Sequence, residues 1–324
     1  MSEITYREAI VQALADELAA DDDVFILGED VGAAGGVFKT VDGLWERFGG
    51  RRVRDTPISE QAIVGCAIGA AVTGLRPVVD LMFADFAASC YDQIINELPK
   101  YRYMTGGQVS LPVTIRMANG AGGGFGAQHS QAAENWFLSE PALQVCVPGT
   151  PADAYGLLRS AIREDNPVLV LEHKNLFNTK GPAPAQGGLV PLGKADVVRT
   201  GEHVTVVATQ LMRQRALEAA ELLAAEGVEI EIVDPRTVAP LDVHTIAASV
   251  AKTNRLAIVQ EAPVAGSWGS TLVGLVLAAA FDDFDAPPVL IGAPDTPIPY
   301  AESLEQAWLP SVERVVAAVR ELVA

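Results

Sequence analysis

The sequence predicts an α/β protein with two α/β domains, each built around a largely parallel sheet. Apolar segments of strand length alternate with segments of helical periodicity along nearly the whole chain, and this alternation is typical of parallel strands covered by helices. A stretch rich in Gly and Pro, residues 174 to 192, interrupts it. Because 324 residues suffice for two ordinary cores, we expect a first domain over 1 to 173, a linker over 174 to 192 and a second domain over 193 to 324.

The first domain begins with a helix, because Thr5 and Glu8 form a capping box ahead of apolar residues at helical spacing. Thr150 followed by Pro151 marks the start of another helix, with Thr as the N-cap and Pro in the first turn. The segment 60 to 72 is apolar on nearly every face, so we expect a fully buried helix there. A further helix is expected at 91 to 101, and strands are expected at 24 to 27, 77 to 83, 113 to 117, 143 to 147 and 168 to 172.

The second domain repeats the alternation on a smaller scale. Parallel strands joined by helices are again the structure that such a pattern predicts. The expected strands are 204 to 208, 229 to 233, 256 to 260 and 289 to 291, and the expected helices are 213 to 226, 243 to 252, 267 to 280 and 311 to 323.

The composition limits the class of protein. The chain has 23 Lys and Arg against 41 Asp and Glu, a formal net charge of −18, which repels nucleic acid phosphates and anionic lipids. The apolar run 268 to 281 is shorter than the about 20 residues of a membrane span, and no secretory signal is visible. The three cysteines, Cys66, Cys90 and Cys146, favour buried free thiols over a disulfide framework. We therefore expect a cytoplasmic protein that binds neither nucleic acid nor membrane.

The segment 122 to 131, GGGFGAQHSQ, allows two interpretations. Its G-x-G-x-x-A spacing matches a loop that binds a dinucleotide phosphate. Such a site needs an acidic residue about 20 positions further on, at the end of a second strand. The nearest acids, Glu134 and Glu140, precede the strand expected at 143. We therefore expect a loop that acts as a hinge and presents His129.

Glu60 lies in the first turn of the apolar helix expected at 60 to 72. A glutamate at this position can simply complement the helix dipole from the surface. In apolar surroundings its pKa would instead be raised, and the protonated carboxyl could donate a hydrogen bond, as some active sites require. The residues by themselves leave both interpretations open.

Six segments in a fixed order carry a resemblance to a known family. They are GEDVG (28 to 32), DTPISE (55 to 60), DQIINELPKYRY (92 to 103), GAQHSQ (126 to 131), PGTPADAYGLLRSAIREDNPV (148 to 168) and DTPIPYAESLEQAWLPS (295 to 311). Together they resemble the beta subunit of the thiamin diphosphate-dependent decarboxylating component of 2-oxo acid dehydrogenase complexes, of the pyruvate or acetoin dehydrogenase type. The resemblance covers essentially the whole chain. It implies a pyrimidine-binding domain with the thiamin diphosphate-binding fold, followed by a transketolase C-terminal-like domain.

The resemblance also implies site residues. Glu60 matches the glutamate that hydrogen-bonds the aminopyrimidine ring of thiamin diphosphate and so promotes formation of the reactive ylid. His129 matches a histidine at the mouth of the active site, which handles the substrate carboxylate or the proton transfers of lipoamide acylation. Met82 and Phe86 match positions that pack on the aminopyrimidine, and we expect Ile58 to join them.

The family further implies ions and partners. A family loop whose carbonyl groups can bind potassium matches a set of residues in which Glu164 stands where the family often has Asp. The set is Val113, Ala161, Ile162, Glu164 and Asn166. Neither the GDG motif nor the paired asparagines that hold the magnesium diphosphate occur in this sequence. The resemblance therefore implies an alpha subunit that holds Mg²⁺ and shares the cofactor in a heterotetramer, and a separate lipoyl-bearing acyltransferase that docks on the C-terminal domain.

Three functions are consistent with these residues. The first is an oxidoreductase subunit, active only with its alpha subunit, for oxidative decarboxylation of a 2-oxo acid and transfer of the acyl group to lipoamide. The segments MFADF, RYMTGGQ and EHKNLF favour pyruvate or acetoin over branched-chain acids as its substrate. The alternatives are half of a split transketolase or deoxyxylulose phosphate synthase-like enzyme, and a non-catalytic docking subunit. The presence of both Glu60 and His129 favours a catalytic subunit.

Overall fold

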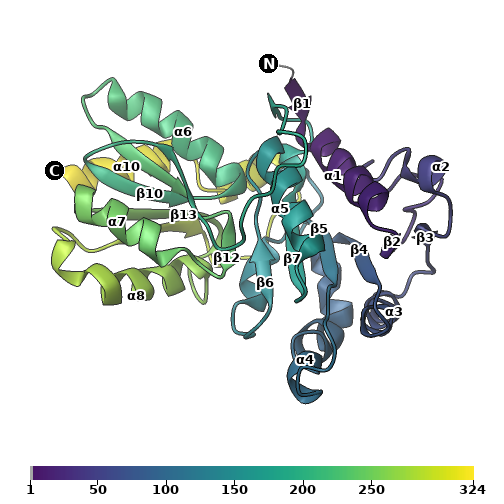
Figure 1. The fold of residues 1–324 in the computed structure, drawn as a ribbon. Coiled ribbons are helices and arrows are strands. Elements are labelled where there is room, and N and C mark those ends of the chain that lie inside the picture. Colours follow the sequence, from purple (N-terminus) through teal and green to yellow (C-terminus); the bar gives the residue numbers. More distant parts are fainter. Residues whose placement is uncertain (1–2) are drawn as a thin grey trace. The chain divides into compact units, whose positions relative to one another are not determined.

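The computed structural model describes residues 3–324, and these residues form two compact units (Figure 1). The first unit contains the chain up to Asn119 together with Trp136–Leu192. The second unit contains Gly120–Asn135 and Gly193–Ala324. Each unit has its own sheet and its own hydrophobic core, so the predicted fold class of two α/β domains with largely parallel sheets is confirmed.

The first unit is built on a parallel sheet with the strand order β6-β7-β5-β4-β2-β3. Its strands are β2 (Val24–Gly28), β3 (Val53–Asp55), β4 (Arg76–Phe83), β5 (Thr114–Asn119), β6 (Gln144–Cys146) and β7 (Val168–His173). Every residue of β2, β5 and β7 is buried, as expected for central strands of a parallel sheet that is covered on both faces. A separate antiparallel pair joins β1 (Glu3–Thr5) to β8 (Lys180–Pro182), and the segment 174 to 192 belongs to this unit.

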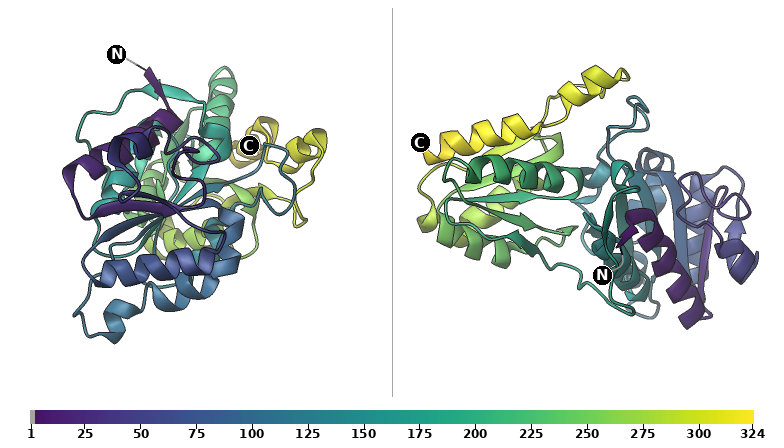
Figure 2. Two further views of the ribbon diagram at one scale, coloured as in Figure 1. Left: turned by 90° about the vertical axis from the view of Figure 1, so that its right-hand side faces the viewer. Right: turned by 90° about the horizontal axis from the view of Figure 1, so that it is seen from above.

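Helices cover both faces of the first sheet, with α1 and α5 on one face and α3 on the other (Figures 1 and 2). The helices are α1 (Tyr6–Ala20), α2 (Leu44–Phe48), α3 (Glu60–Val72), α4 (Tyr101–Met104) and α5 (Pro151–Arg163). The shorter helical turns are η1 (Ala84–Cys90), η2 (Gln93–Glu97), η3 (Ala133–Phe137) and η4 (Lys174–Leu176). The helix predicted at 91 to 101 is only partly present. Residues 91 to 97 are helical and end in the π-helical segment η2, residues 98 to 100 form a turn, and α4 begins at Tyr101.

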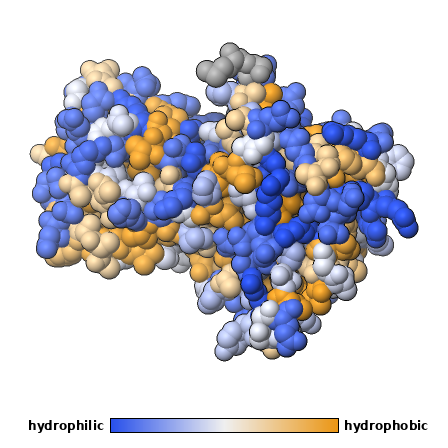
Figure 3. Space-filling view, in the orientation of Figure 1, coloured by the Kyte–Doolittle hydropathy of each residue, from blue (hydrophilic) through white to orange (hydrophobic). Residues whose placement is uncertain are grey.

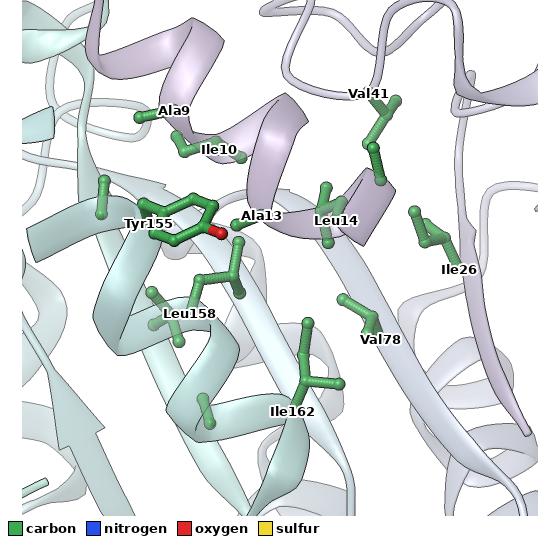
Figure 4. Packing of buried hydrophobic residues seen from close by; sticks show 14 of the residues in the cluster. Ala9, Ile10, Ala13, Leu14, Ile26, Val41, Val78, Tyr155, Leu158 and Ile162 are labelled. Atoms are coloured by element: carbon green, nitrogen blue, oxygen red, sulfur yellow. The ribbon is translucent and has the colours of Figure 1, made fainter. Parts of the chain in front are cut away.

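The ends of α1 and α5 follow the predicted capping residues. Thr5 Oγ1 accepts the Glu8 N–H at 3.2 Å, and the Glu8 carboxylate accepts the Thr5 N–H at 2.7 Å. At the start of α5, Thr150 Oγ1 accepts the Asp153 N–H at 3.1 Å, and Pro151 stands at the first helical position. The apolar faces of the two helices pack against each other, and Figure 4 shows Ile10 and Tyr155 in this core. Local capping and one amphipathic face therefore account for both helices.

The prediction that α3 is buried on all sides is wrong within this chain. Ile63, Val64, Ala67, Ile68 and Ala71 are its buried residues and contribute its inner face. The outer face, made of Ala62, Gly65, Cys66, Gly69 and Val72, is exposed. The apolar composition of a helix does not show which surface covers it. Among residues 3–324, beyond the chain neighbours and the backbone of α3 itself, no atom lies within 4 Å of a Cβ built on Gly65 or Gly69.

The second unit has a sheet of strand order β14-β13-β10-β11-β9, in which β9 alone runs antiparallel to its neighbour. Its strands are β9 (Asp196–Arg199), β10 (Val204–Ala208), β11 (Ile230–Asp234), β13 (Leu256–Pro263) and β14 (Val289–Ala293), and β12 (Thr237–Ala239) is a further short strand. Its helices are α6 (Gln210–Ala224), α7 (Val243–Thr253), α8 (Trp268–Ala280), η5 (Phe281–Asp283), α9 (Glu302–Trp308) and α10 (Val312–Val323). Figure 1 shows α6 and α10 on one face of the sheet and α7 and α8 on the other.

The surface of α8 is unusually apolar for a helix at the edge of a unit. Leu275 is 43% exposed, and Phe281, which follows the helix, is 72% exposed. Figure 3 shows the hydrophobic surface over this helix. No helix in the described part of the chain combines the length and hydrophobicity that a membrane span requires.

Candidate active site

Glu60 lies at the carboxyl edge of the first sheet, where ligands of open parallel sheets commonly bind. It follows β3 and starts α3, and its side chain is partly buried. The loops after β2 and β3 are joined here, because the Gly32 N–H donates to Asp55 Oδ1 at 2.7 Å. Ile58, in the same loop as Glu60, is 82% exposed.

The carboxylate of Glu60 acts on two neighbouring ionisable groups. Burial, and then the negative charge of Glu60, raise the pKa of Glu29. Burial and the same charge raise the pKa of the Cys90 thiol to about 12. Glu60 therefore forms a partly buried acidic cluster with Glu29.

Met82 and Phe86 follow β4 at the same edge of the sheet. Met82 has a φ of 65°, which is rare for a residue other than glycine. Its N–H donates to Asp80 Oδ1 at 2.9 Å, and the register between β4 and β5 shifts just after Asp80. Phe86 packs edge-on against Phe83 with 5.6 Å between the ring centroids. Met82 and Phe86 remain partly exposed, so both side chains can contact a ligand.

A buried arginine supports this edge of the sheet. Arg116 Nε and Nη2 donate to the two carboxylate oxygens of Glu172 at 2.9 and 2.7 Å, and its Nη1 donates to Asp80 Oδ2 at 2.8 Å. Burial alone would lower the pKa of Arg116, but the charges of Glu172 and Asp80 raise it. Burial raises the pKa of Glu172, and the guanidinium opposes that rise. Asp80 thus connects Arg116 to the backbone of Met82.

His129 belongs to the second unit, in the loop that connects β5 to η3. The ends of the loop are joined by a hydrogen bond from the Gly120 N–H to the Gln131 carbonyl oxygen at 3.1 Å. The side chain of His129 is partly exposed. The amides of Gly122 and Gly124, which a dinucleotide phosphate would need, donate to the carboxylate of Glu305 instead, and this agrees with the rejection of a dinucleotide site.

Of the residues expected near potassium, Ala161, Ile162 and Glu164 lie at the C-terminal end of α5. Val113 directly precedes β5, and its carbonyl oxygen accepts the Val168 N–H at 3.0 Å. The carbonyl oxygens of Ile162 and Glu164 accept hydrogen bonds from Arg76 Nη1 at 3.2 and 3.3 Å. Asn166 Oδ1 accepts from Arg102 Nη1 at 2.7 Å. Because the last carbonyl groups of a helix carry a partial negative charge, this end suits a cation, and Arg76 provides one from the chain itself. Across residues 3–324, no cluster of three or more His, Cys, Asp or Glu side chains could hold a metal ion.

Several site residues went unnoticed in the sequence. Asp80, Arg116 and Glu172 are charged residues within three buried or largely buried strands, and that pattern could have suggested an ion network across neighbouring strands. Glu305 lies within the matched segment 295 to 311, but no local pattern connects it to the glycine-rich loop.

Known proteins resemble this chain over its whole length. The model of the transketolase pyrimidine binding domain matches residues 2–180, and that of the transketolase C-terminal domain matches residues 193–315. A pyruvate dehydrogenase E1 component subunit beta of Rhizobium meliloti (strain 1021) is 44% identical over 321 residues, covering 99% of this chain and 70% of that protein.

Two further relatives come from Bacillus subtilis (strain 168). An acetoin:2,6-dichlorophenolindophenol oxidoreductase subunit beta is 43% identical, covering 98% of this chain and 97% of the relative. A 2-oxoisovalerate dehydrogenase subunit beta is 42% identical and covers 99% of both chains. Among solved structures, a split gene transketolase, described as an inactive beta4 tetramer, has a TM-score of 0.81 at 26% identity and covers 99% of this chain and 98% of its own.

Proposed function

The chain belongs to the family of E1 component beta subunits of 2-oxo acid dehydrogenase complexes, and from this premise we propose that it acts in the oxidative decarboxylation of a 2-oxo acid. The family is transketolase-like and depends on thiamin diphosphate. When bound, this cofactor supplies the electron sink that decarboxylation requires. The observation that carries the proposal is Glu60, partly buried in an acidic cluster at the carboxyl edge of a parallel sheet, within a chain that matches the family from end to end.

Each site residue of the first unit has a part in this proposal. The carboxyl group of Glu60 would hold the aminopyrimidine ring by a hydrogen bond and could exchange a proton at that bond. Met82 and Phe86 would pack on the ring, and Ile58, which lies in the loop before α3 and is 82% exposed, would be free to join them. The strained backbone of Met82 fixes the direction of that side chain.

His129 is proposed to act on the substrate side of the reaction. A partly exposed imidazole can bind the substrate carboxylate or move a proton during acyl transfer to lipoamide. Replacement of His129 by Ala tests this role. We expect the lipoamide-dependent reaction or substrate binding to be impaired, and unaltered overall turnover would remove His129 from the mechanism.

We propose pyruvate or acetoin as the substrate, on the strength of the segments MFADF, RYMTGGQ and EHKNLF. The relatives named for pyruvate, acetoin and 2-oxoisovalerate are 44%, 43% and 42% identical, so their identities do not choose among the three. Turnover measured with each of the three purified substrates decides which one the enzyme uses. Much faster turnover of branched-chain 2-oxo acids would refute this choice.

An alpha subunit is the proposed partner, and it would hold the Mg²⁺ diphosphate in a heterotetramer. Two observations support it: the sequence has no GDG motif, and α3 exposes a face of small apolar residues directly beside Glu60 in the chain. A second chain packed on this face would remove it from water and would bring its own residues to the cofactor. We propose further that a lipoyl-bearing acyltransferase docks on the C-terminal domain, and that the protein is cytoplasmic.

A potassium ion at the end of α5 is a further proposal. Carbonyl oxygens are suitable ligands for hard cations, and those of Ala161, Ile162 and Glu164 follow one another in the last turn. Because Arg76 already donates to two of these oxygens, the ion would share them with a guanidinium, and we expect weak occupancy.

The experiment that tests the function is reconstitution. The chain is purified alone and after co-expression with an alpha-type subunit, and reduction of an artificial electron acceptor by 2-oxo acids is measured with thiamin diphosphate and Mg²⁺. We expect activity in the pair only. Activity of the isolated chain would contradict the shared site, and an inactive assembled pair would contradict the proposed reaction.

Half of a split transketolase is the second candidate, because the solved split gene transketolase matches 99% of this chain at a TM-score of 0.81. Such an enzyme acts on sugar phosphates and needs basic groups for them. Turnover of sugar phosphates by the pair, without turnover of 2-oxo acids, would favour this candidate.

A further inference from the structure

The loop that carries His129 is folded around a buried carboxylate. Glu305, on α9, is only 1% exposed. Its Oε1 accepts the Gly122 N–H at 2.9 Å and its Oε2 accepts the Gly124 N–H at 3.1 Å. A neighbouring amide, that of Ala121, donates to Glu261, another buried carboxylate. Several backbone N–H groups of one short loop therefore point toward negative charge.

Glycines make this geometry accessible. Gly122, Gly124 and Gly126 have φ values of 100°, 69° and 73°, a region that residues with a Cβ rarely adopt. Left-handed positions that alternate with other backbone conformations can turn N–H groups to one side and create a small anion-binding concavity. In this chain the anion is the side chain of Glu305, so the glycine-rich sequence and the distant glutamate form one structural feature.

The contact with Glu305 also changes what the loop can do. A run of glycines without such a contact would be a flexible hinge, because glycine loses the most conformational freedom on ordering. Two hydrogen bonds to one charged group, each stronger than a neutral hydrogen bond, restrain the loop at Gly122 and Gly124. His129 follows on the same loop, before the hydrogen bond from the Gly120 N–H to the Gln131 carbonyl closes it. The loop that was expected to act as a hinge is thus restrained by its hydrogen bonds to Glu305.

We propose that Glu305 is a positioning residue for His129. Its carboxylate holds Gly122 and Gly124 so that the imidazole stands where the substrate-side step requires it, while Glu305 itself contacts no reacting atom. This inference rests on the proposed function of His129. It predicts that loss of the carboxylate damages the same step as loss of the imidazole.

The substitution that tests the proposal is Glu305→Gln. The amide keeps the shape of the side chain but loses its charge, and it offers one acceptor oxygen where two N–H groups need partners. Glu302→Gln is the matched control, because Glu302 is an exposed glutamate on the same helix. Gly124→Ala is a second variant. Among residues 3–324, apart from the two chain neighbours, no atom lies within 4 Å of a Cβ at this position, so the substitution strains the backbone of the loop without a steric clash elsewhere.

Turnover is measured on the assembled alpha–beta pair with its cofactors, in the lipoamide-dependent reaction and with the artificial acceptor. We expect Glu305→Gln to lower the turnover roughly 10- to 100-fold in whichever of the two reactions His129→Ala impairs. A misplacement of a reacting group by about 1 Å can produce losses in this range. The double variant should be no slower than His129→Ala alone, because both changes remove one function. Fully multiplicative losses would overturn the positioning role.

Chymotrypsin provides a readout that does not depend on activity. Phe125 lies in the loop and is 44% exposed, so cleavage after it reports how firmly the loop is held. We expect faster cleavage of Glu305→Gln and Gly124→Ala than of the parent and of Glu302→Gln. Unchanged cleavage of Glu305→Gln would overturn the proposed restraint.

The positioning role is tested by comparing cleavage with turnover. Faster cleavage with unchanged turnover would overturn the positioning role. If His129→Ala itself were fully active, the proposed function of His129 would fail, while cleavage would still decide whether Glu305 holds the loop.

Discussion

Replacing Arg116 by Met would leave two carboxylates without their cation in the centre of the first sheet. The side chains of Arg116 and Glu172 are 2% and 3% exposed, and that of Asp80 is 15% exposed. Removing one partner of a buried ion pair costs about 3 to 5 kcal/mol, because the remaining charge stays buried and unpaired. For a domain of this size we expect the Tm to fall by about 6 to 20 °C.

The loss of stability in Arg116→Met should depend on pH, and the direction of this dependence follows from the pKa of Glu172. Burial already raises this pKa, and removal of the guanidinium raises it further. A carboxyl with a raised pKa binds its proton more tightly in the folded state than in the unfolded state, so folding is favoured as the pH falls through the folded pKa. The difference in Tm between Arg116→Met and the parent should therefore be larger at pH 8 than at pH 5.5.

The assay is calorimetry at both pH values, with hydrogen exchange of β4, β5 and β7 to locate the loosened region. Arg320→Met is the matched control, because Arg320 pairs with Glu226 on the surface and both side chains are well exposed. We expect a small change in Tm for the control. The double variant Arg116→Met/Glu172→Met should recover part of the lost stability, since it also removes the unpaired buried carboxylate of Glu172. Equal losses for Arg116→Met and Arg320→Met, or a deficit that grows at low pH, would refute the reasoning.

Three other predictions concern the proposed site and its partner. Glu60→Gln, which keeps the shape but cannot exchange the proton in the same way, should nearly abolish decarboxylation while the pair still assembles on gel filtration; substantial residual activity would exclude Glu60 from the chemistry. In the isolated chain a maleimide should label the exposed Cys66 but not Cys90 and Cys146, because both are buried and burial raises the pKa of each thiol to about 12. If the alpha subunit covers α3, it should protect Cys66 from the maleimide. Arg76→Met should lower the Tm by several degrees, and potassium should restore more of it than sodium at equal ionic strength; no difference between the salts would count against the potassium site.

Patterns within short stretches of the sequence predicted the α/β class and most of its elements. The capping box at Thr5, the Thr–Pro start of α5 and the apolar strand runs specify local structure through contacts among near neighbours, and these contacts do not depend on the rest of the fold. The segments that resemble the family also directed attention to Glu60 and His129, since those residues lie within the matched motifs.

The tertiary structure decided which distant residues meet. Strand order brings Asp80, Arg116 and Glu172 together, although they come from three separate strands. The fold of the second unit places Glu305 against Gly122 across more than half of the chain. The exposed face of α3 is a further example. The apolar residues of a helix indicate that one side avoids water, but they do not indicate which surface covers that side. Such contacts depend on the path of the whole chain, and no local spacing encodes that path.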